Sequence, residues 1–161
     1  MAVSGRERRS LAGSSPAAAA GAGGAGASQN RTTMSTEPCP CGSTLMYTAC
    51  CGRWHAGPQH LQAANAEALM RSRYSAYVLG RADYLRDTWH PRTRPAAAWV
   101  PDPALRWLGL EVRRHIVHDA DHASVEFVAR SKVGGRAARM HETSRFVREN
   151  GRWFYVDGDT R

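Results

Sequence analysis

Four cysteines lie within thirteen residues, CPCGSTLMYTACC, and they are the only cysteines of this 161-residue chain. The spacing of Cys39, Cys41, Cys50 and Cys51 is Cys-x-Cys-x8-Cys-Cys. Four thiolates are the ligand set of a tetrahedral structural zinc site. The turn predicted at CGS can point backbone N–H groups at sulfur. The pattern therefore predicts one structural Zn²⁺ held by these four cysteines, with no ligand position left open for catalysis.

Two alternatives compete with zinc. A disulfide would have to join Cys39 or Cys41 to Cys50 or Cys51, because a bridge between adjacent cysteines is strained. Disulfides are disfavoured in a reducing compartment, and the density of the cysteines argues against unrelated thiols. His55 is close enough in sequence to be a spare ligand. Since four ligands are already present, we expect His55 to be a hydrogen-bonding neighbour of the site.

Residues 1–33 differ in composition from the rest. The stretch LAGSSPAAAAGAGGAGAS, residues 11–28, has no bulky apolar residue after Leu11, so it cannot bury enough surface to offset chain entropy. Three interpretations compete: a weak resemblance of RRSL to a twin-arginine export signal, a disordered tail, and a true start at Met34. We favour the start at Met34 and expect residues 1–33 to have no function.

The formal net charge is +8, almost all of it from arginine. The basic residues are scattered along the sequence and no aromatic-rich RNA-binding signature accompanies them. Specific nucleic-acid recognition is therefore not expected. No apolar run approaches the roughly 18–20 residues that span a bilayer. We expect a soluble, cytoplasmic protein that does not enter a membrane.

The sequence becomes helical in pattern from residue 62, where Asn65 can cap the start of a helix and Gly80 suits its end. A second short helix follows and ends at His90-Pro91, and the proline-rich residues 91–104 are predicted to be a loop. The apolar stripes of the two helices are Leu69, Met70, Tyr74, Tyr77 and Val78, then Tyr84, Leu85 and Trp89.

Beyond residue 105 apolar side chains alternate, which predicts strands near 106–117, 122–132, 137–148 and 152–157. Gly134-Gly135 and Asn150-Gly151 suit two-residue hairpin turns with positive φ. Helices followed by an antiparallel meander make an α+β domain. We expect three segments: a leader over 1–33, a zinc-binding element over 34–58, and the α+β domain over 62–161.

The two turns set a register in which Ala129 faces Met140, Glu126 faces Thr143, and Phe146 faces Tyr155. One face of the sheet is then rich in apolar side chains and should pack on the helices. Its predicted members are Val125, Phe127, Ala129, Met140, Phe146, Trp153 and Tyr155, interrupted by Glu142, Ser144 and Asp157. The other face brings together Glu126, His141 and Arg145, which we interpret as a cross-strand salt bridge.

Polar groups on the helix-facing side define a candidate pocket. We predict that it is lined by Tyr74, Trp89, His90, Glu142 and Asp157. A histidine beside a carboxylate can serve acid–base chemistry, and the alternative is a buried hydrogen-bond network. No nucleophile elbow, phosphate loop or open metal site is present in the sequence, so no catalytic residue is assigned and the chain is expected not to be an enzyme.

Two parts of the chain resemble known families. PCPCGSTLMYTACCG resembles the SEC-C motif, the zinc-binding element at the tail of the SecA translocation ATPase. LMRSRYSAYVLGRADYLRDTWHP, WLGLEV, VEFVAR, HETSRF and GRWFYVDG resemble the bacterial YchJ family, and the combined likeness covers residues 38–158. It implies an NTF2-like domain, similar to nuclear transport factor 2, in which helices close a curved sheet into a cone. It implies no reaction, and residues 1–33 depart from the family pattern.

Two classes of function follow. In the first, the zinc element docks a partner protein or a ribosomal surface, and the chain is an adaptor. In the second, the cone binds or transforms a small molecule. The closed metal site is the strongest motif and favours the adaptor. The sheet face that does not pack on the helices is expected to meet either the cysteine segment or a second copy of the chain, which is a further candidate partner.

Overall fold

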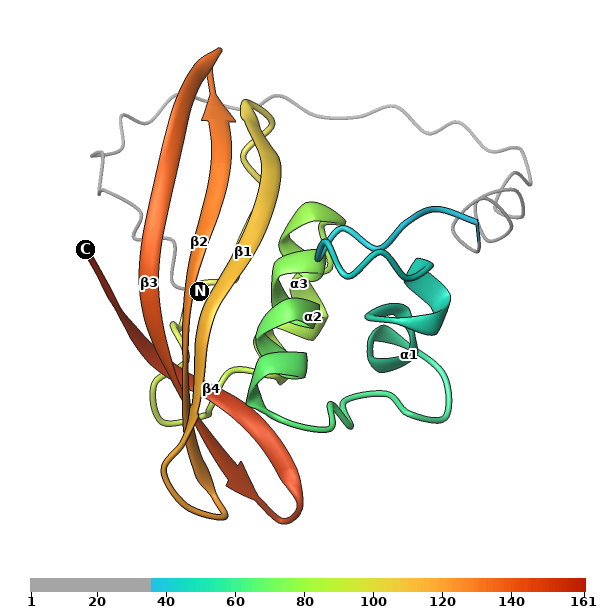
Figure 1. Cartoon of the computed structure of the whole chain (residues 1–161), viewed down its shortest axis with the longest axis vertical. Coiled ribbons are helices and arrows are strands. Elements are labelled where there is room, and N and C mark those ends of the chain that lie inside the picture. The colour runs from blue at the N-terminus through green and yellow to red at the C-terminus, as the bar shows by residue number, and fades with distance from the viewer. Residues whose placement is uncertain (1–35) are drawn as a thin grey trace, which may run out of the picture.

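The computed structural model describes residues 36–161 (Figure 1). The interpretations of residues 1–33 fall outside this range. A short 3₁₀ helix, Tyr47–Ala49, and α1, Gly52–His55, follow the first cysteines. The larger part contains α2, Ala66–Val78, and α3, Ala82–Asp87, then β1, Leu105–Val117, β2, His122–Val133, β3, Arg136–Glu149, and β4, Arg152–Thr160. Within the described range, no helix has the length and apolar character needed to cross a membrane.

The four strands form one antiparallel sheet in the order β1-β2-β3-β4. Both predicted hairpin turns are present, with φ of 55° and 81° at Gly134 and Gly135 and of 50° and 75° at Asn150 and Gly151. The predicted register is confirmed, because Ala129 pairs with Met140, Glu126 with Thr143 and Phe146 with Tyr155. The alternation of side chains and the turn chemistry were sufficient to predict these pairs.

Strand β4 is longer than predicted and contains a bulge. Phe146 pairs with Tyr155 whereas Arg145 pairs with Asp157, so Val156 is an extra residue in β4. A bulge of this kind reverses the face to which the following side chains point. Asp157 therefore lies on the face opposite the helices, where it forms an ion pair with Arg145. The prediction that Asp157 lies on the helix-facing side is wrong for this reason.

Helix α2 packs between the sheet and the cysteine-containing segment (Figure 1). As predicted, the side chain of Asn65 caps it by accepting a hydrogen bond of 2.8 Å from the Ala68 N–H. Val78, predicted in the buried stripe, is 37% exposed at the end of the helix. Residues 91–104 contain no helix or strand, as predicted.

The main core lies between the helices and one face of the sheet. It contains Leu69, Met70, Tyr74, Tyr77, Tyr84, Leu85, Val125, Phe127, Ala129, Phe146, Trp153 and Tyr155. These are mostly the residues of the predicted apolar face and the two predicted helical stripes. The α+β architecture, with helices on one side of an open four-stranded sheet, is confirmed (Figure 1).

Candidate metal centre

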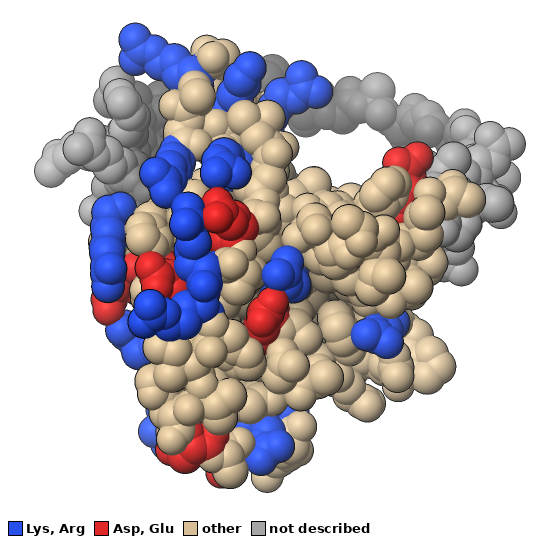
Figure 2. All heavy atoms as spheres, viewed as in Figure 1, with Lys and Arg blue, Asp and Glu red and all other residues tan. Residues whose placement is uncertain are grey.

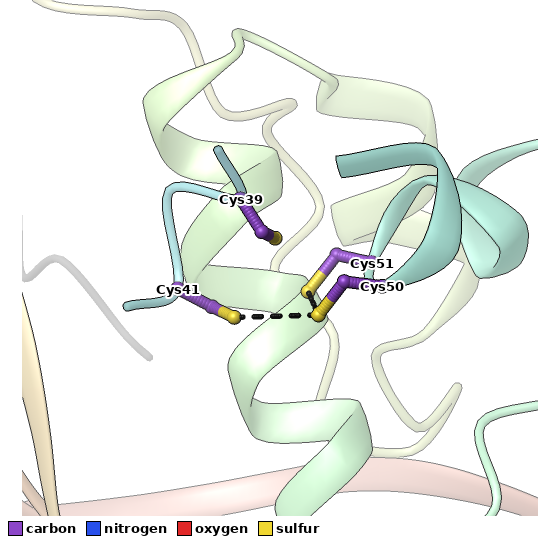
Figure 3. Close-up of side chains that lie close together, drawn as sticks. All are labelled: Cys39, Cys41, Cys50 and Cys51. Atoms are coloured by element: carbon purple, nitrogen blue, oxygen red, sulfur yellow. Dashed lines mark hydrogen bonds between the residues drawn. The ribbon is translucent and has the colours of Figure 1, made fainter. Parts of the chain in front are cut away.

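The four cysteines come from two short segments that meet over α2. Cys39 and Cys41 lie on a turn, and Cys50 and Cys51 lie where α1 begins (Figure 3). All four are buried, and their sulfur atoms lie within 4.8 Å of one another. The segment 36–55, here called the tab, therefore presents four thiols to one point.

The sulfur geometry fits a bound metal ion better than disulfides. Two of the separations are 3.6 Å, from Cys41 Sγ to Cys50 Sγ, and 3.9 Å, from Cys50 Sγ to Cys51 Sγ. Ligands at about 2.3 Å from a tetrahedral ion lie about 3.8 Å from one another. A disulfide needs about 2.05 Å between its sulfur atoms, and all four cysteines are free. The arrangement can hold a metal ion.

Both backbone N–H groups and hydroxyls lie next to the sulfur atoms, and the backbone N–H groups of Cys41 and Cys51 hydrogen-bond to Cys39. Ser43 Oγ lies 3.0 Å from Cys50 Sγ, and Ser75 Oγ, on α2, lies 3.6 Å from Cys39 Sγ. The predicted turn is present, with φ of 76° at Gly42 and the Gly42 N–H donating to the Cys39 carbonyl over 3.2 Å. Hydroxyls that donate to sulfur disperse thiolate charge and orient the ligands.

Mutual proximity also sets the ionisation of the thiols. The pKa of Cys39 is lowered because its thiolate accepts hydrogen bonds from Cys41 and Cys51. The same bond to Cys39 raises the pKa of Cys41 to about 11, and bonds to Cys39 and Cys41 raise the pKa of Cys51. The pKa shifts thus favour a thiolate at Cys39 and oppose ionisation of Cys41 and Cys51. A cation at the centre is what allows several thiolates to share the site.

His55 is a structural neighbour of the cluster, as predicted. Its Nε2 lies 2.8 Å from the Ser72 carbonyl and must donate to it, so Nδ1 accepts the hydrogen bond of 2.7 Å from the Tyr47 hydroxyl. The imidazole also packs on Tyr84 with ring centroids 4.4 Å apart. Burial lowers the pKa of His55 to about 4. The neutral ring therefore joins the tab to α2 and α3.

Three of the five predicted pocket residues lie in the core. Tyr74 packs on Trp107 with centroids 5.5 Å apart, and burial raises its pKa to about 12. Glu142 is buried and accepts a hydrogen bond of 2.6 Å from Ser144. Trp89 packs edge-on against Tyr155. Burial raises the pKa of Tyr155, and the charge of Glu142 acts in the same direction.

The other two predicted pocket residues, His90 and Asp157, lie elsewhere. His90 Nε2 lies 3.1 Å from Glu149 Oε1, and its ring packs on Phe154 with centroids 5.9 Å apart. Glu149 and Phe154 belong to the sheet positions that alternate with the helix-facing Phe146 and Tyr155. His90 thus reaches past β4 to the face away from the helices. His90 does lie beside a carboxylate, but this is Glu149 and not one of the predicted pocket residues Glu142 and Asp157.

One buried charge was not predicted from the sequence. Arg73 is 1% exposed, and its guanidinium lies 4.6 Å from the ring centroid of Tyr155 and 5.2 Å from that of Trp89. Its Nη1 donates to the Leu85 carbonyl and to the Thr88 hydroxyl. The sequence did contain a signal for the burial of Arg73, because this residue lies one helical turn from both Leu69 and Tyr77, within the predicted apolar stripe.

A cavity of about 490 Å³ lies between the end of α2, the loop 91–104 and the start of β1. Its lining includes Tyr77, Trp99 and Trp107. None of the five predicted pocket residues lines it, nor a second cavity of about 630 Å³ between His60 and Arg152. The predicted polar residues therefore belong to a packed core and an outer face.

Comparison with known proteins gives the family. Residues 65–158 match the family described as YchJ, middle NTF2-like domain, and residues 36–53 match the SEC-C motif. The chain belongs to the YchJ family. A UPF0225 protein of Bordetella parapertussis is 56% identical over 79% of the chain and 96% of its own length. A UPF0225 protein of Methylibium petroleiphilum is 62% identical over 76% of the chain and 88% of its own length.

Two solved structures have the same fold as this YchJ-family chain. A SEC-C motif-containing protein from Rhodopseudomonas palustris has a TM-score of 0.67 and 34% identity, covering 78% of this chain and 99% of that one. A SEC-C motif-containing protein from Psychrobacter arcticus has a TM-score of 0.65 and 31% identity, covering 78% and 83%. The expected pairing of a SEC-C motif with an NTF2-like domain is confirmed.

Proposed function

We propose that this protein is an adaptor whose tab, folded around one structural Zn²⁺, docks a partner protein. The observation that carries the proposal is the closed set of four buried cysteine ligands. An all-cysteine site suits zinc in a structural role, because every coordination position is filled and the ion has none to offer a substrate. The metal would supply the folding energy that a segment of this size lacks.

The tab also exposes apolar surface. Leu45 is 52% exposed and Met46 is 47% exposed, although both lie on the connection between the two cysteine pairs. The Cys39 N–H donates to the Leu45 carbonyl, and Pro38 and Met46 form a β-bridge, so the backbone beneath these side chains is fixed. An apolar pair on a rigid support loses little entropy on binding. We infer that Leu45 and Met46 contact the partner.

A capture experiment tests the adaptor. Three tagged proteins are used to capture partners from the same cell extract: the wild-type protein, the tab variant Leu45→Ser/Met46→Ser, and the control variant Val100→Ser/Val117→Ser. The control changes Val100 and Val117 because they are exposed apolar residues outside the tab. A partner identified by mass spectrometry is then purified and titrated against the three proteins. We expect the tab variant to lose binding while keeping its metal, and the control to bind normally. Equal binding by the tab variant contradicts the proposal.

A second candidate function rests on the cavity beside Tyr77, Trp99 and Trp107. Aromatic rings lining a cavity of this size are typical of sites for small apolar or planar molecules. A thermal-shift screen of metabolites tests this candidate, with Trp99→Leu as the matched variant. A compound that raises the melting temperature of the wild-type protein but not of the variant supports it. A screen without such a compound counts against it.

A further inference from the structure

Basic side chains that are scattered in the sequence gather at one end of the sheet. The basic sheet end consists of Arg106 on β1, Arg130 and Lys132 on β2, and Arg139 on β3. Arg130 and Lys132 alternate with the buried, helix-facing Phe127 and Ala129, so the set lies on the face away from the helices. Figure 2 shows Lys and Arg gathered over this end of the sheet.

The pairing of these residues is costly for the fold. Arg106 is directly opposite Lys132, and Arg130 is directly opposite Arg139. Like charges at directly opposed positions destabilise an antiparallel pair. Within the described residues, only Arg130 of the set has an acidic partner, Glu111 at 3.2 Å. The fold therefore keeps two like-charge pairs at this end of the sheet.

The described domain has an overall excess of positive charge, and the basic sheet end contributes to it. The chain has 22 basic and 14 acidic residues. Residues 1–33 contain four of the basic residues and one of the acidic residues, so 18 basic and 13 acidic residues remain in the rest of the chain. The basic sheet end and Arg136, which follows the hairpin turn, make up five of the 18. The other 13 basic residues are balanced by the 13 acidic ones. The basic sheet end itself has four basic side chains and one acidic neighbour, Glu111, a local excess of positive charge of the kind that attracts a polyanion.

The surroundings of these charges distinguish between polyanions. On the basic face itself the β2–β3 tip adds small residues, Gly134, Gly135 and Ala137, and no aromatic ring, while Ser131, Ala138 and the exposed Val133 alternate with the basic positions. Single-stranded nucleic acid is usually held by stacking its bases on aromatic side chains, and protein interfaces have an aromatic or aliphatic centre. A surface of small residues from which guanidinium groups project suits a phosphate backbone, because arginine binds phosphate through paired hydrogen bonds.

The width of the surface favours one kind of duplex. The basic side chains come from three adjacent strands, spaced about 4.8 Å apart. The major groove of B-form DNA admits a helix or a two-stranded ribbon, and a three-stranded face is too broad to enter it. A-form RNA has a wide, shallow minor groove bordered by phosphates, and proteins recognise it by shape and backbone contacts. We propose that the basic sheet end binds the phosphate backbone of double-stranded RNA without reading its sequence.

The test is fluorescence anisotropy with a short labelled RNA duplex of mixed sequence over a range of salt concentrations. The variant Lys132→Gln/Arg139→Gln removes one member of each repulsive pair and leaves the Arg130–Glu111 pair intact. The control Arg86→Gln/Arg92→Gln removes the same charge from exposed residues on α3 and the loop after it. We expect the first variant to bind at least about tenfold more weakly and its log–log salt slope to be smaller by about 2. The control should match the wild-type protein.

Further measurements separate a site from a general charge effect. Removing like-charge repulsion should leave the melting temperature of Lys132→Gln/Arg139→Gln no lower than that of the wild-type protein, so weaker binding cannot come from unfolding. Duplex DNA, single-stranded RNA and poly-glutamate serve as competitors. The proposal is overturned if RNA duplex does not bind, if both variants weaken binding equally, or if any competitor binds as tightly as the duplex RNA.

Discussion

Acidification should loosen the attachment of the tab through His55. The buried imidazole is neutral because burial lowers its pKa from 6.5 to about 4. In the unfolded chain the same group takes up a proton near pH 6.5. Between these two pKa values the unfolded state binds more protons than the folded state, so stability falls as the pH falls. The contribution of His55 is complete above pH 6.5 and is lost towards pH 4.

The size of this loss follows from the pKa shift. A difference of one pKa unit corresponds to about 1.36 kcal/mol, so the shift of His55 amounts to about 3 kcal/mol in total and about 2 kcal/mol between about pH 6.5 and about pH 5. The side chain is only 5% exposed, so solvent screens the effect little. Its charge would be buried between Tyr47, Ser72 and Tyr84. The loss should be visible as reduced free energy of unfolding.

Urea unfolding at pH 7.5, 6 and 5 measures this loss of unfolding free energy, with the variant His55→Gln as the reference. Glutamine can donate to Ser72 and accept from Tyr47 but does not titrate. Other groups and the metal affect both proteins alike, so the difference between their pH curves isolates His55. We expect the wild-type protein to lose about 2 kcal/mol more than His55→Gln over this range. Parallel curves would refute the reasoning.

Three other predictions concern the metal, the core and the outer face. Elemental analysis should find about one zinc per chain in the wild-type protein and none in Cys51→Ser. Chelation of the metal should unfold the tab while the circular dichroism signal of the β-strands persists. A metal-free protein with two disulfides would contradict this prediction. Gly158→Ala should lower the free energy of unfolding, measured in a denaturation curve, by about 1–3 kcal/mol. The reason is that the new Cβ would lie 2.8 Å from Cδ of the buried Glu142. Unchanged stability would show that the Glu142 side chain can move away. Asp157→Asn should change the free energy of unfolding by less than about 1 kcal/mol, since the ion pair of Asp157 with Arg145 is half exposed. A larger loss in the same assay would mean that Asp157 is buried.

The features that could be predicted from the sequence depend on residues close together in the chain. Gly134-Gly135 and Asn150-Gly151 determine two-residue turns, and once the turns are known the period of two assigns every partner as far as Phe146. The cysteine spacing similarly identified the complete cluster. At such short range, backbone conformation and ligand chemistry leave few alternatives.

The errors arose where packing overrides local pattern. The bulged residue Val156 is neither glycine nor proline, and Gly158, two residues further along β4, is the only such signal within the strand. One inserted residue was enough to reverse the side of Asp157. Arg73 was passed over because a charged residue in an apolar stripe is normally taken as exposed, whereas here two aromatic rings and two oxygen acceptors surround its guanidinium. Such burial depends on partners from α3 and β4 that the helix sequence does not contain.

The position of α2 has a consequence for how the tab can be inherited or transplanted. One side of the helix faces the sheet, and the other supplies Arg71, which donates to the Cys41 carbonyl, together with the Ser72 carbonyl and the Ser75 hydroxyl. Trp54 of the tab in turn belongs to the main core. A graft of residues 36–55 onto another scaffold would leave Trp54 in water and all three contacts unmade. The smallest portable unit is therefore the tab together with α2, so a recombination event that separates them would transfer the cysteines without the surface on which they fold.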